Sequence, residues 1–278
     1  MAELRTVDGW TWAYEVDGRG WPLLMLHGFT GRHDSWWPVA DRLAASYRII
    51  RVDMPGHGES RFPADARERS MEEAVRSLLR LMDALGVERF HLLGYSMGGR
   101  TALSLAVHAP RRVTGLVLES ASPGLEDPVA RRDRQRQDEA LADWVEAHGV
   151  AAFAKRWAEQ PLFSSQLRLA EPVRRRVQAI RLGQTAEGLA ASLRAMGTGA
   201  QTPVWDRLDA VVAPTLLVTG ALDEKFCAIA RRMQAKLPDA AWVCVPDAGH
   251  TVHLEQPEAY VEAVLGHLAA CDERRARR

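Results

Sequence analysis

The chain contains 278 residues, and its 36 Lys and Arg residues balance its 36 Asp and Glu residues, so the formal net charge is zero. A chain of this length buries enough apolar surface to fold without a disulfide or a metal, and it fits one α/β domain with an insertion. The neutral balance gives no support to nucleic-acid or membrane binding, so we expect neither as a partner. Three scattered cysteines are too few for a disulfide framework or a zinc site.

The sequence is expected to contain neither an N-terminal signal peptide nor a membrane span. Residues 1–5 lack the apolar run of a signal peptide, and no stretch approaches the ~20 apolar residues of a membrane span. We therefore expect a cytoplasmic protein. Residues 271–278 are basic and are expected to form a frayed, solvated tail.

The predicted strands begin with a hairpin, because residues 4–7 and 10–16 alternate in polarity around Asp8-Gly9. Short apolar runs then recur along the chain. They are residues 23–26, 49–53, 90–94, 113–119, 215–220 and 241–245. Continuous apolar runs of this length favour strands that are buried on both faces, as in a parallel sheet.

Predicted helices lie between these strands. Residues 71–85 carry an apolar stripe at helical spacing that ends at Gly86, and the other candidates are residues 97–109, 226–237 and 257–270. Strands that alternate with helices indicate right-handed crossovers and a doubly wound α/β sheet.

The alternation stops between residues 125 and 200, where the sequence is charged and helical in pattern. We interpret residues 125–200 as a helical lid inserted between two parts of the core, residues 1–124 and 201–270. Two groups of arginines crowd this lid, and the simplest interpretation of each is a solvated helix face. The groups are Arg131, Arg132, Arg134 and Arg136, and Arg174, Arg175, Arg176 and Arg181.

The strongest motif is Gly94-Tyr95-Ser96-Met97-Gly98, which runs from an apolar strand directly into a helix. In this nucleophile elbow, the glycines let the backbone turn tightly and leave the serine oxygen exposed above the sheet. The strand before it and the helix after it supply the structural context that the motif needs. Ser96 is therefore the predicted reactive group.

A reactive serine needs a base, and the base needs a group that fixes its tautomer. Asp223 follows the predicted strand 215–220, and His250 follows the last predicted strand. Both lie at carboxyl ends of strands, where an open sheet gathers its site. His253 lies past this loop, and His57 is better placed to shape a turn. The sequence therefore predicts a triad of Ser96, Asp223 and His250.

Two backbone amides are expected to form an oxyanion hole, one from Met97 and one from Phe29 in the loop after the first parallel strand. Arg100 is less expected, because it lies four residues after Ser96 near the positive end of the helix. Either a buried salt bridge neutralises it, or an anionic substrate binds beside Ser96. In the second case the lid arginines are possible partners, since guanidinium binds carboxylate through two parallel hydrogen bonds.

With these residues in place, the sequence resembles the 2-succinyl-6-hydroxy-2,4-cyclohexadiene-1-carboxylate synthase family of menaquinone biosynthesis, within the α/β-hydrolase superfamily. The likeness covers nearly the whole chain. Its most specific parts are the elbow extended to Gly98-Gly99-Arg100, the Ser122-Pro123-Gly124-Leu125 segment and the Asp223-Glu224-Lys225-Phe226 segment. The remaining motifs are Leu26-His27-Gly28-Phe29-Thr30-Gly31, Val52-Asp53-Met54-Pro55-Gly56-His57-Gly58 and Pro161-Leu162-Phe163-Ser164-Ser165.

The resemblance implies roles for individual residues. Ser96, Asp223 and His250 would be the triad. Arg100, Arg134 and Arg181 would bind carboxylates, Tyr95 would line the pocket, and Trp157 would close its lid side.

The implied reaction needs no cofactor and is not a hydrolysis. It is loss of pyruvate by 2,5-elimination from a small substrate that carries an enolpyruvyl group, a succinyl arm and a ring carboxylate. His250 would take the Ser96 proton, and the alkoxide would act as general base on a ring carbon. The Phe29 and Met97 amides would stabilise charge on the succinyl carbonyl. Three substrate carboxylates would explain why a neutral protein concentrates arginine around one pocket.

Three alternatives stay open. A carboxylesterase or other acyl hydrolase would use the same triad covalently, and a C–C bond hydrolase would act on a carboxylated substrate. A non-catalytic binding protein would keep the pocket without turnover. Oligomeric state and the role of Cys227 are left without a prediction.

Overall fold

One mixed sheet organises the computed structural model, which describes residues 2–6, 9–65 and 69–277. In this described part the strand order is β1-β2-β4-β3-β5-β6-β7-β8. β1 pairs antiparallel with β2, β2 pairs antiparallel with β4, and the remaining pairs are parallel. The strands are β1 Ala2–Arg5, β2 Thr11–Asp17, β3 Pro22–Leu26, β4 Arg48–Val52, β5 Phe90–Tyr95, β6 Val113–Glu119, β7 Thr215–Gly220 and β8 Ala240–Val245.

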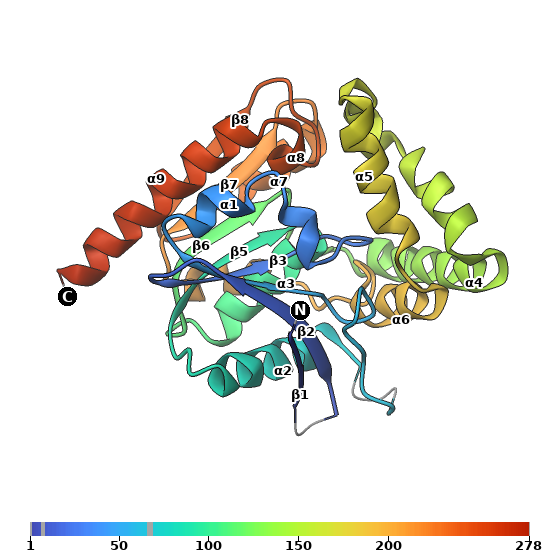
Figure 1. Ribbon diagram of the computed structural model, residues 1–278, viewed down its shortest axis with the longest axis horizontal. Helices are drawn as coiled ribbons and strands as arrows, with labels where there is room; N and C mark the ends of the chain where they lie inside the picture. The colour runs from blue at the N-terminus through green and yellow to red at the C-terminus, as the bar shows by residue number, and fades with distance from the viewer. Residues whose placement is uncertain (1, 7–8, 66–68, 278) are drawn as a thin grey trace.

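Helices cover both faces of the sheet (Figure 1). On one face the apolar core joins the sheet to α2 Met71–Ala84, α3 Met97–His108 and α7 Glu224–Gln234. On the other face it joins the sheet to α1 Ala40–Ala44, α8 Val252–Glu255 and α9 Pro257–Ala276. Short 3-10 helices are η1 His33–Trp36, η3 Pro161–Arg168 and η4 Trp205–Ala210.

The predicted α/β class is confirmed, and the local sequence explains the elements. β6 is buried at every position, as its apolar run requires between two helical layers. The Ser70 side chain accepts the Glu73 N–H at the start of α2, and Gly86 takes φ +69° just past its end. The β1–β2 hairpin forms as predicted, with Ala2 opposite Tyr14, although Asp8 of its expected turn lies outside the described residues.

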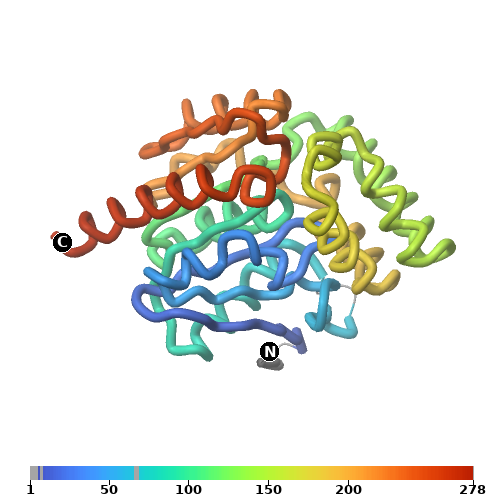
Figure 2. Tube along the Cα trace, turned by 45° about the horizontal axis from the view of Figure 1, so that its top comes forward, coloured from blue at the N-terminus to red at the C-terminus, as the bar shows by residue number. Residues whose placement is uncertain are grey.

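The segment between β6 and β7 is helical (Figure 2). It contains α4 Pro128–Ala158, α5 Glu171–Leu182 and α6 Ala186–Met196, with η3 between α4 and α5. These helices lie together at one side of the sheet, and α4 and α6 share an apolar cluster of their own. That cluster is Ala142, Val145, Phe153, Leu189, Ala190 and Leu193. The α4–α6 pair therefore has its own core, against which Phe29 of the sheet domain packs.

The C-terminal segment differs from the expected frayed tail. α9 continues to Ala276, Cys271 is buried, and Tyr47 donates to the Asp272 carboxylate at 3.1 Å. The Arg275 guanidinium lies 3.6 Å from the centroid of the Trp21 ring. Basic side chains with long apolar stems pack well on aromatic surfaces, and a composition count does not reveal such contacts. Residues 271–276 are therefore helical and not frayed, although Glu273, Arg274 and Ala276 are exposed, as expected of a solvated end.

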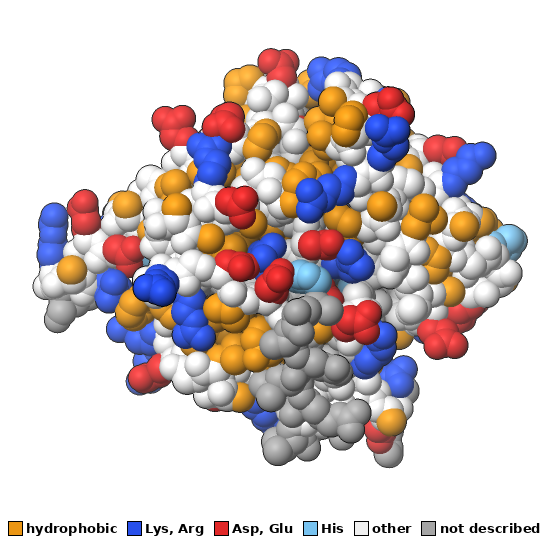
Figure 3. All heavy atoms as spheres, in the orientation of Figure 1, with side chains coloured by type: hydrophobic (Ala, Val, Ile, Leu, Met, Phe, Trp, Pro, Cys, Tyr) orange, Lys and Arg blue, Asp and Glu red, His pale blue; other side chains and the backbone are white. Residues whose placement is uncertain are grey.

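The surface carries both signs of charge. Figure 3 shows Lys and Arg side chains interspersed with Asp and Glu across one face of the molecule, as the neutral net charge suggests. Within residues 2–6, 9–65 and 69–277, no helix combines the length and apolar content that a membrane crossing needs.

Buried histidines make the fold sensitive to acid. Burial lowers the pKa of His27 to about 4, of His57 to about 3 and of His91 to about 4, from an ordinary value of 6.5. The unfolded chain binds protons at these histidines near pH 6.5, whereas the folded chain does not until a lower pH. Stability is therefore complete above pH 6.5 and is lost as the pH falls toward 4.

We expect the free energy of unfolding to fall by about 2 kcal/mol per buried histidine between pH 7 and pH 5. Urea unfolding at the two pH values measures this difference in the free energy of unfolding. His91→Gln should reduce the pH dependence, whereas the exposed His148→Gln should not. Equal stability of the wild-type chain at pH 7 and pH 5 would contradict the prediction.

Candidate active site

Ser96 lies at the turn between β5 and α3 with φ +51° and ψ −110°. A non-glycine residue in this region is strained, and the turn persists because its surroundings leave no alternative. A Cβ atom at Gly98 would collide with the Leu26 carbonyl oxygen, and one at Gly94 would collide with the Gly98 carbonyl oxygen. Both glycines are therefore needed for the close approach of strand and helix, and the Ser96 oxygen is presented at the end of the sheet.

The three predicted triad residues meet in the structure. The His250 Nε2 atom lies 3.0 Å from the Ser96 Oγ atom, and the His250 Nδ1 atom lies 2.6 Å from an Asp223 carboxylate oxygen. The carboxylate favours the tautomer in which Nδ1–H donates to Asp223, which leaves Nε2 as an acceptor for the serine proton. Only 2% of His250 is exposed, so this pair works in a largely dry environment.

Residues next to the triad hold the Asp223 carboxylate and the His250 ring in place. The second Asp223 carboxylate oxygen accepts the Phe226 N–H at 3.3 Å at the start of α7. The Phe226 ring packs on the His250 ring at a centroid distance of 4.6 Å. The first turn of α7 therefore orients Asp223 and also covers one side of His250.

The two predicted oxyanion donors flank Ser96. Met97 is the first residue of α3, so its N–H has no acceptor within the helix. The Gly28-Phe29 loop approaches so closely that a Cβ at Gly28 would lie 2.5 Å from the Tyr95 ring and 3.4 Å from the Ser96 Cβ atom. Phe29 and Met97 both line the cavity that contains Ser96.

This Ser96 cavity has a volume of about 190 Å³. Core and lid both contribute to its walls. Its polar and charged lining includes Ser96, His250, Arg100, Arg134, Ser122 and Lys225, and its apolar lining includes Phe29, Met97, Trp157, Leu193, Met196 and Phe226. The cavity therefore combines a reactive serine with several cations.

Arg100 is 9% exposed, and no carboxylate in the described part of the chain forms a salt bridge with it. Its guanidinium donates instead to the Gln201 side-chain oxygen and to the Met196 carbonyl oxygen, both at 2.9 Å. Burial lowers the pKa of Arg100 to about 10, and the nearby Arg134 contributes to the shift. The buried salt bridge that the sequence left open is therefore absent among the described residues, and the site has an excess of positive charge.

Arg134 and Trp157 bring the lid to the same cavity. The Arg134 Nε–H donates at 2.7 Å to the Asp138 carboxylate, one turn along α4. The Trp157 ring packs against the Phe29 ring at 5.2 Å, and its buried indole N–H has no acceptor among the described residues. An unpartnered buried donor beside the reactive serine is available to a ligand.

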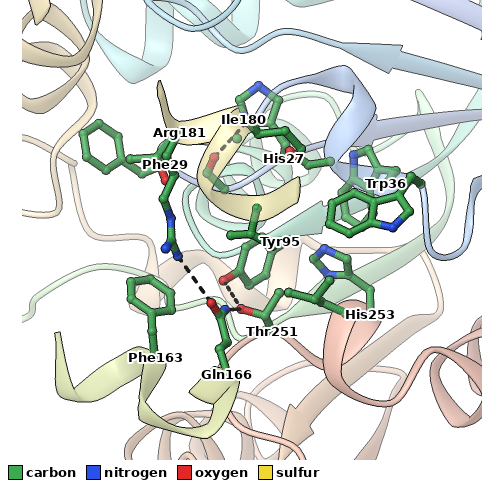
Figure 4. Close-up of a pocket in the computed structure, with 17 residues that line it drawn as sticks. His27, Phe29, Trp36, Tyr95, Phe163, Gln166, Ile180, Arg181, Thr251 and His253 are labelled. Atoms are coloured by element: carbon green, nitrogen blue, oxygen red, sulfur yellow. Dashed lines mark hydrogen bonds between the residues drawn. The ribbon is translucent and has the colours of Figure 1, made fainter. Parts of the chain in front are cut away.

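Tyr95 and Arg181 line a neighbouring cavity and not the Ser96 cavity (Figure 4). The Tyr95 hydroxyl lies 2.7 Å from the Thr251 hydroxyl, and burial raises the pKa of Tyr95. The Arg181 guanidinium lies over the Phe163 ring at 5.1 Å and donates to Gln166 at 3.4 Å, and burial lowers its pKa. Phe29 lines both cavities, so the two are neighbours.

Two residues at the site were missed by sequence reasoning. Lys225 lines the Ser96 cavity, and its position two residues after Asp223 was the available signal. Glu255 was missed without any signal. Its carboxylate accepts the Gly249 N–H at 2.8 Å through one oxygen and the Thr251 N–H at 3.1 Å through the other. These amides stand on either side of His250, so Glu255 fixes the backbone that carries the base.

Glu255→Gln is expected to lower kcat about tenfold and to change KM little. A glutamine has one acceptor oxygen, so one amide N–H would face an NH2 group and the His250 loop would loosen. Steady-state kinetics measure the effect, and Glu262→Gln on the exposed side of α9 is the control. An unchanged kcat in a folded Glu255→Gln enzyme would show that the loop needs no such support.

The described residues contain no group of three or more His, Cys, Asp or Glu side chains placed to hold a metal ion.

The chain is similar to known proteins in sequence and in fold. Residues 22–257 match the family model for the alpha/beta hydrolase fold. A Bacillus subtilis protein provisionally named 2-succinyl-6-hydroxy-2,4-cyclohexadiene-1-carboxylate synthase is 44% identical over 248 residues, which cover 89% of this chain and 90% of the relative. The synthase of the same name from Salmonella schwarzengrund is 31% identical and covers 87% of this chain and 91% of the relative. The structure of MenH from S. aureus superposes with a TM-score of 0.89 at 31% identity, covering 94% of this chain and 98% of that one.

Proposed function

We propose the reaction and its residues from one premise, that this chain belongs to the 2-succinyl-6-hydroxy-2,4-cyclohexadiene-1-carboxylate synthase family, within the α/β-hydrolase fold. The chain eliminates pyruvate from 2-succinyl-5-enolpyruvyl-6-hydroxy-3-cyclohexene-1-carboxylate to give the product in the family name. The observation that carries this function is the buried Arg100, which has no carboxylate partner among the described residues and lines the same cavity as Ser96 and His250.

The triad supplies the base. His250 Nε2 takes the Ser96 proton across 3.0 Å, and the Asp223 carboxylate stabilises the resulting imidazolium. The Ser96 alkoxide removes the proton from the ring carbon that carries the succinyl group. Because this carbon is next to a carbonyl, the electron pair delocalises onto the carbonyl oxygen, which the Phe29 and Met97 amides stabilise.

Collapse of this enolate completes the elimination. The ring double bond shifts, the bond from carbon 5 to the enolpyruvyl oxygen breaks, and a 2,4-diene forms. The departing enolpyruvate takes up a proton and becomes pyruvate. No acyl group is transferred to Ser96, which is a hydroxyl again as soon as it has taken the ring proton. The proton held by His250 goes to the departing enolpyruvate, so both residues end the cycle as they began it.

The cations of the two cavities suit a substrate with three carboxylates. Arg100 and Arg134 line the Ser96 cavity and would bind the carboxylates nearest the ring, with Trp157 closing the lid side. Arg181 and Tyr95 lie in the neighbouring cavity, so they would receive an arm of the substrate that extends past Phe29. The substrate therefore spans core and lid.

The runner-up is a hydrolase that uses the same triad covalently. A serine, a histidine and two backbone amides also suit attack on a carboxylic ester or on a C–C bond next to a carbonyl. Such an enzyme would need a carboxylated substrate to account for Arg100, since a neutral ester gains nothing from a buried guanidinium.

One experiment separates the two reactions. Freshly generated enolpyruvyl substrate is mixed with the enzyme, and pyruvate is followed against its spontaneous release, with a simple aryl ester assayed in parallel. Fast pyruvate release with negligible ester cleavage supports the lyase. Fast ester cleavage with pyruvate release at the spontaneous rate would replace it with the hydrolase.

A further inference from the structure

Two cysteines that the proposed reaction does not use lie in contact beside the active site. The Sγ atoms of Cys227 and Cys244 are 3.6 Å apart, and both cysteines are free thiols. Cys227 is buried on α7, whereas Cys244 is exposed on β8, the last strand of the sheet. An exposed cysteine is therefore in contact with a buried one.

The pair is held by the packing of α7 on β7 and β8. Thr219 of β7 is opposite Cys244 in the parallel register, and its hydroxyl lies 3.3 Å from the Cys227 sulfur. The Cys227 thiol also lies 3.3 Å from the Gly220 carbonyl oxygen. Because helix and strand are both anchored, the two sulfurs stay near one another without a covalent bond.

We propose that Cys227 and Cys244 form a redox modification site, at which a hydroperoxide drives closure of an intramolecular disulfide that lowers the activity of the neighbouring triad. The Cys244 sulfur attacks the peroxide, which breaks the O–O bond, releases water or an alcohol and leaves a sulfenic acid. The Cys227 sulfur then attacks that sulfur and displaces water. Two thiols are oxidised by two electrons, and one peroxide is reduced.

Exposure sets the order of these steps. Peroxide reaches the exposed Cys244 first, and burial raises the pKa of the Cys227 thiol, which makes Cys227 the slower group to react with an oxidant. Once Cys244 is a sulfenic acid, Cys227 reacts with it faster than any thiol in solution does, because the two sulfurs are already 3.6 Å apart. The buried Cys271, beside His267 on α9, has no such partner in the described part of the chain.

The disulfide would reach the triad through the first turn of α7. The Cys227 N–H donates to the Asp223 carbonyl oxygen at 3.0 Å, and Asp223 holds His250. Phe226, which packs on the His250 ring, is the residue before Cys227. To bond, the sulfurs must close from 3.6 Å to about 2 Å. This shift displaces the first turn of α7, which orients the Asp223 carboxylate of the triad.

The test treats the full-length enzyme with hydrogen peroxide and measures both linkage and activity. Intact-mass spectrometry should show the loss of two hydrogen masses, and peptide mapping should place the link between Cys227 and Cys244 while Cys271 remains alkylatable. We expect kcat to fall about tenfold, and a dithiol reductant should restore it. Cys244→Ser should keep wild-type activity before treatment and should resist peroxide.

Each readout can overturn the proposal. Two alkylatable thiols at positions 227 and 244 after peroxide, or a sulfinic acid at Cys244 without a link, would remove the disulfide. A complete link with unchanged kcat would remove the coupling to Asp223. The mass measurement needs no substrate, so a failure here is distinct from a failure of the proposed reaction.

Discussion

Ser96→Ala is expected to lower kcat for pyruvate release by about 10³-fold and to leave substrate binding nearly intact. The variant lacks the oxygen that receives the ring proton, and no other hydroxyl lies within hydrogen-bonding distance of the His250 Nε2 atom among the described residues. The cavity and its arginines remain in place. Pyruvate release under single-turnover conditions measures the loss, and a binding assay with the product measures what remains.

Ser104→Ala, a buried change on the same helix, is the matched control and should release pyruvate at nearly the wild-type rate. Pyruvate release by Ser96→Ala within tenfold of the wild-type rate would mean that another group removes the proton. The triad would then serve some other step.

Arg100→Ala is expected to lower kcat/KM for elimination by about 10- to 100-fold, because a charge-assisted hydrogen bond contributes about 1.5–3 kcal/mol. The buried guanidinium has no carboxylate partner in the described part of the chain, so its charge is available to the substrate. Arg100→Lys should recover part of the loss, since it keeps the charge but loses the second parallel hydrogen bond.

Arg132→Ala removes an exposed lid arginine and should leave kcat/KM near the wild-type value. Thermal unfolding of Arg100→Ala, compared with that of the wild type, checks that the variant is folded and that its loss of activity does not come from a loss of structure. Wild-type kinetics in a folded Arg100→Ala enzyme would remove Arg100 from substrate binding and with it the main argument for an anionic substrate.

The sequence predicted the core well because each signal was local. Each apolar run became a strand within a residue or two, and Gly94, Ser96 and Gly98 sit in one turn whose geometry the residue types dictate. Asp223 and His250 could be chosen because parallel strands end at one edge, which brings distant loops together. The resemblance to a family is confirmed by the comparisons.

The features that sequence reasoning missed depend on packing between distant segments. Tyr95 adjoins Ser96 in the chain, yet its side chain lines the neighbouring cavity with Arg181, and strand order alone does not tell which cavity a side chain enters. Glu255 binds two amides around His250, and a carboxylate in a helix has the same appearance in sequence when it faces solvent. The contacts of α9 were missed for the same reason, because a basic composition does not show that its side chains pack on the core.

In the proposed reaction Ser96 removes a proton from carbon, and a hydrogen-isotope measurement tests that step. The substrate is prepared with deuterium at the ring carbon that bears the succinyl group, and pyruvate release in a single turnover is compared with that from unlabelled substrate. Pyruvate release is expected to be slower from the deuterated substrate, because a C–D bond breaks more slowly than a C–H bond. Equal rates, together with a covalent adduct on Ser96, would contradict it and would identify the enzyme as a nucleophilic hydrolase.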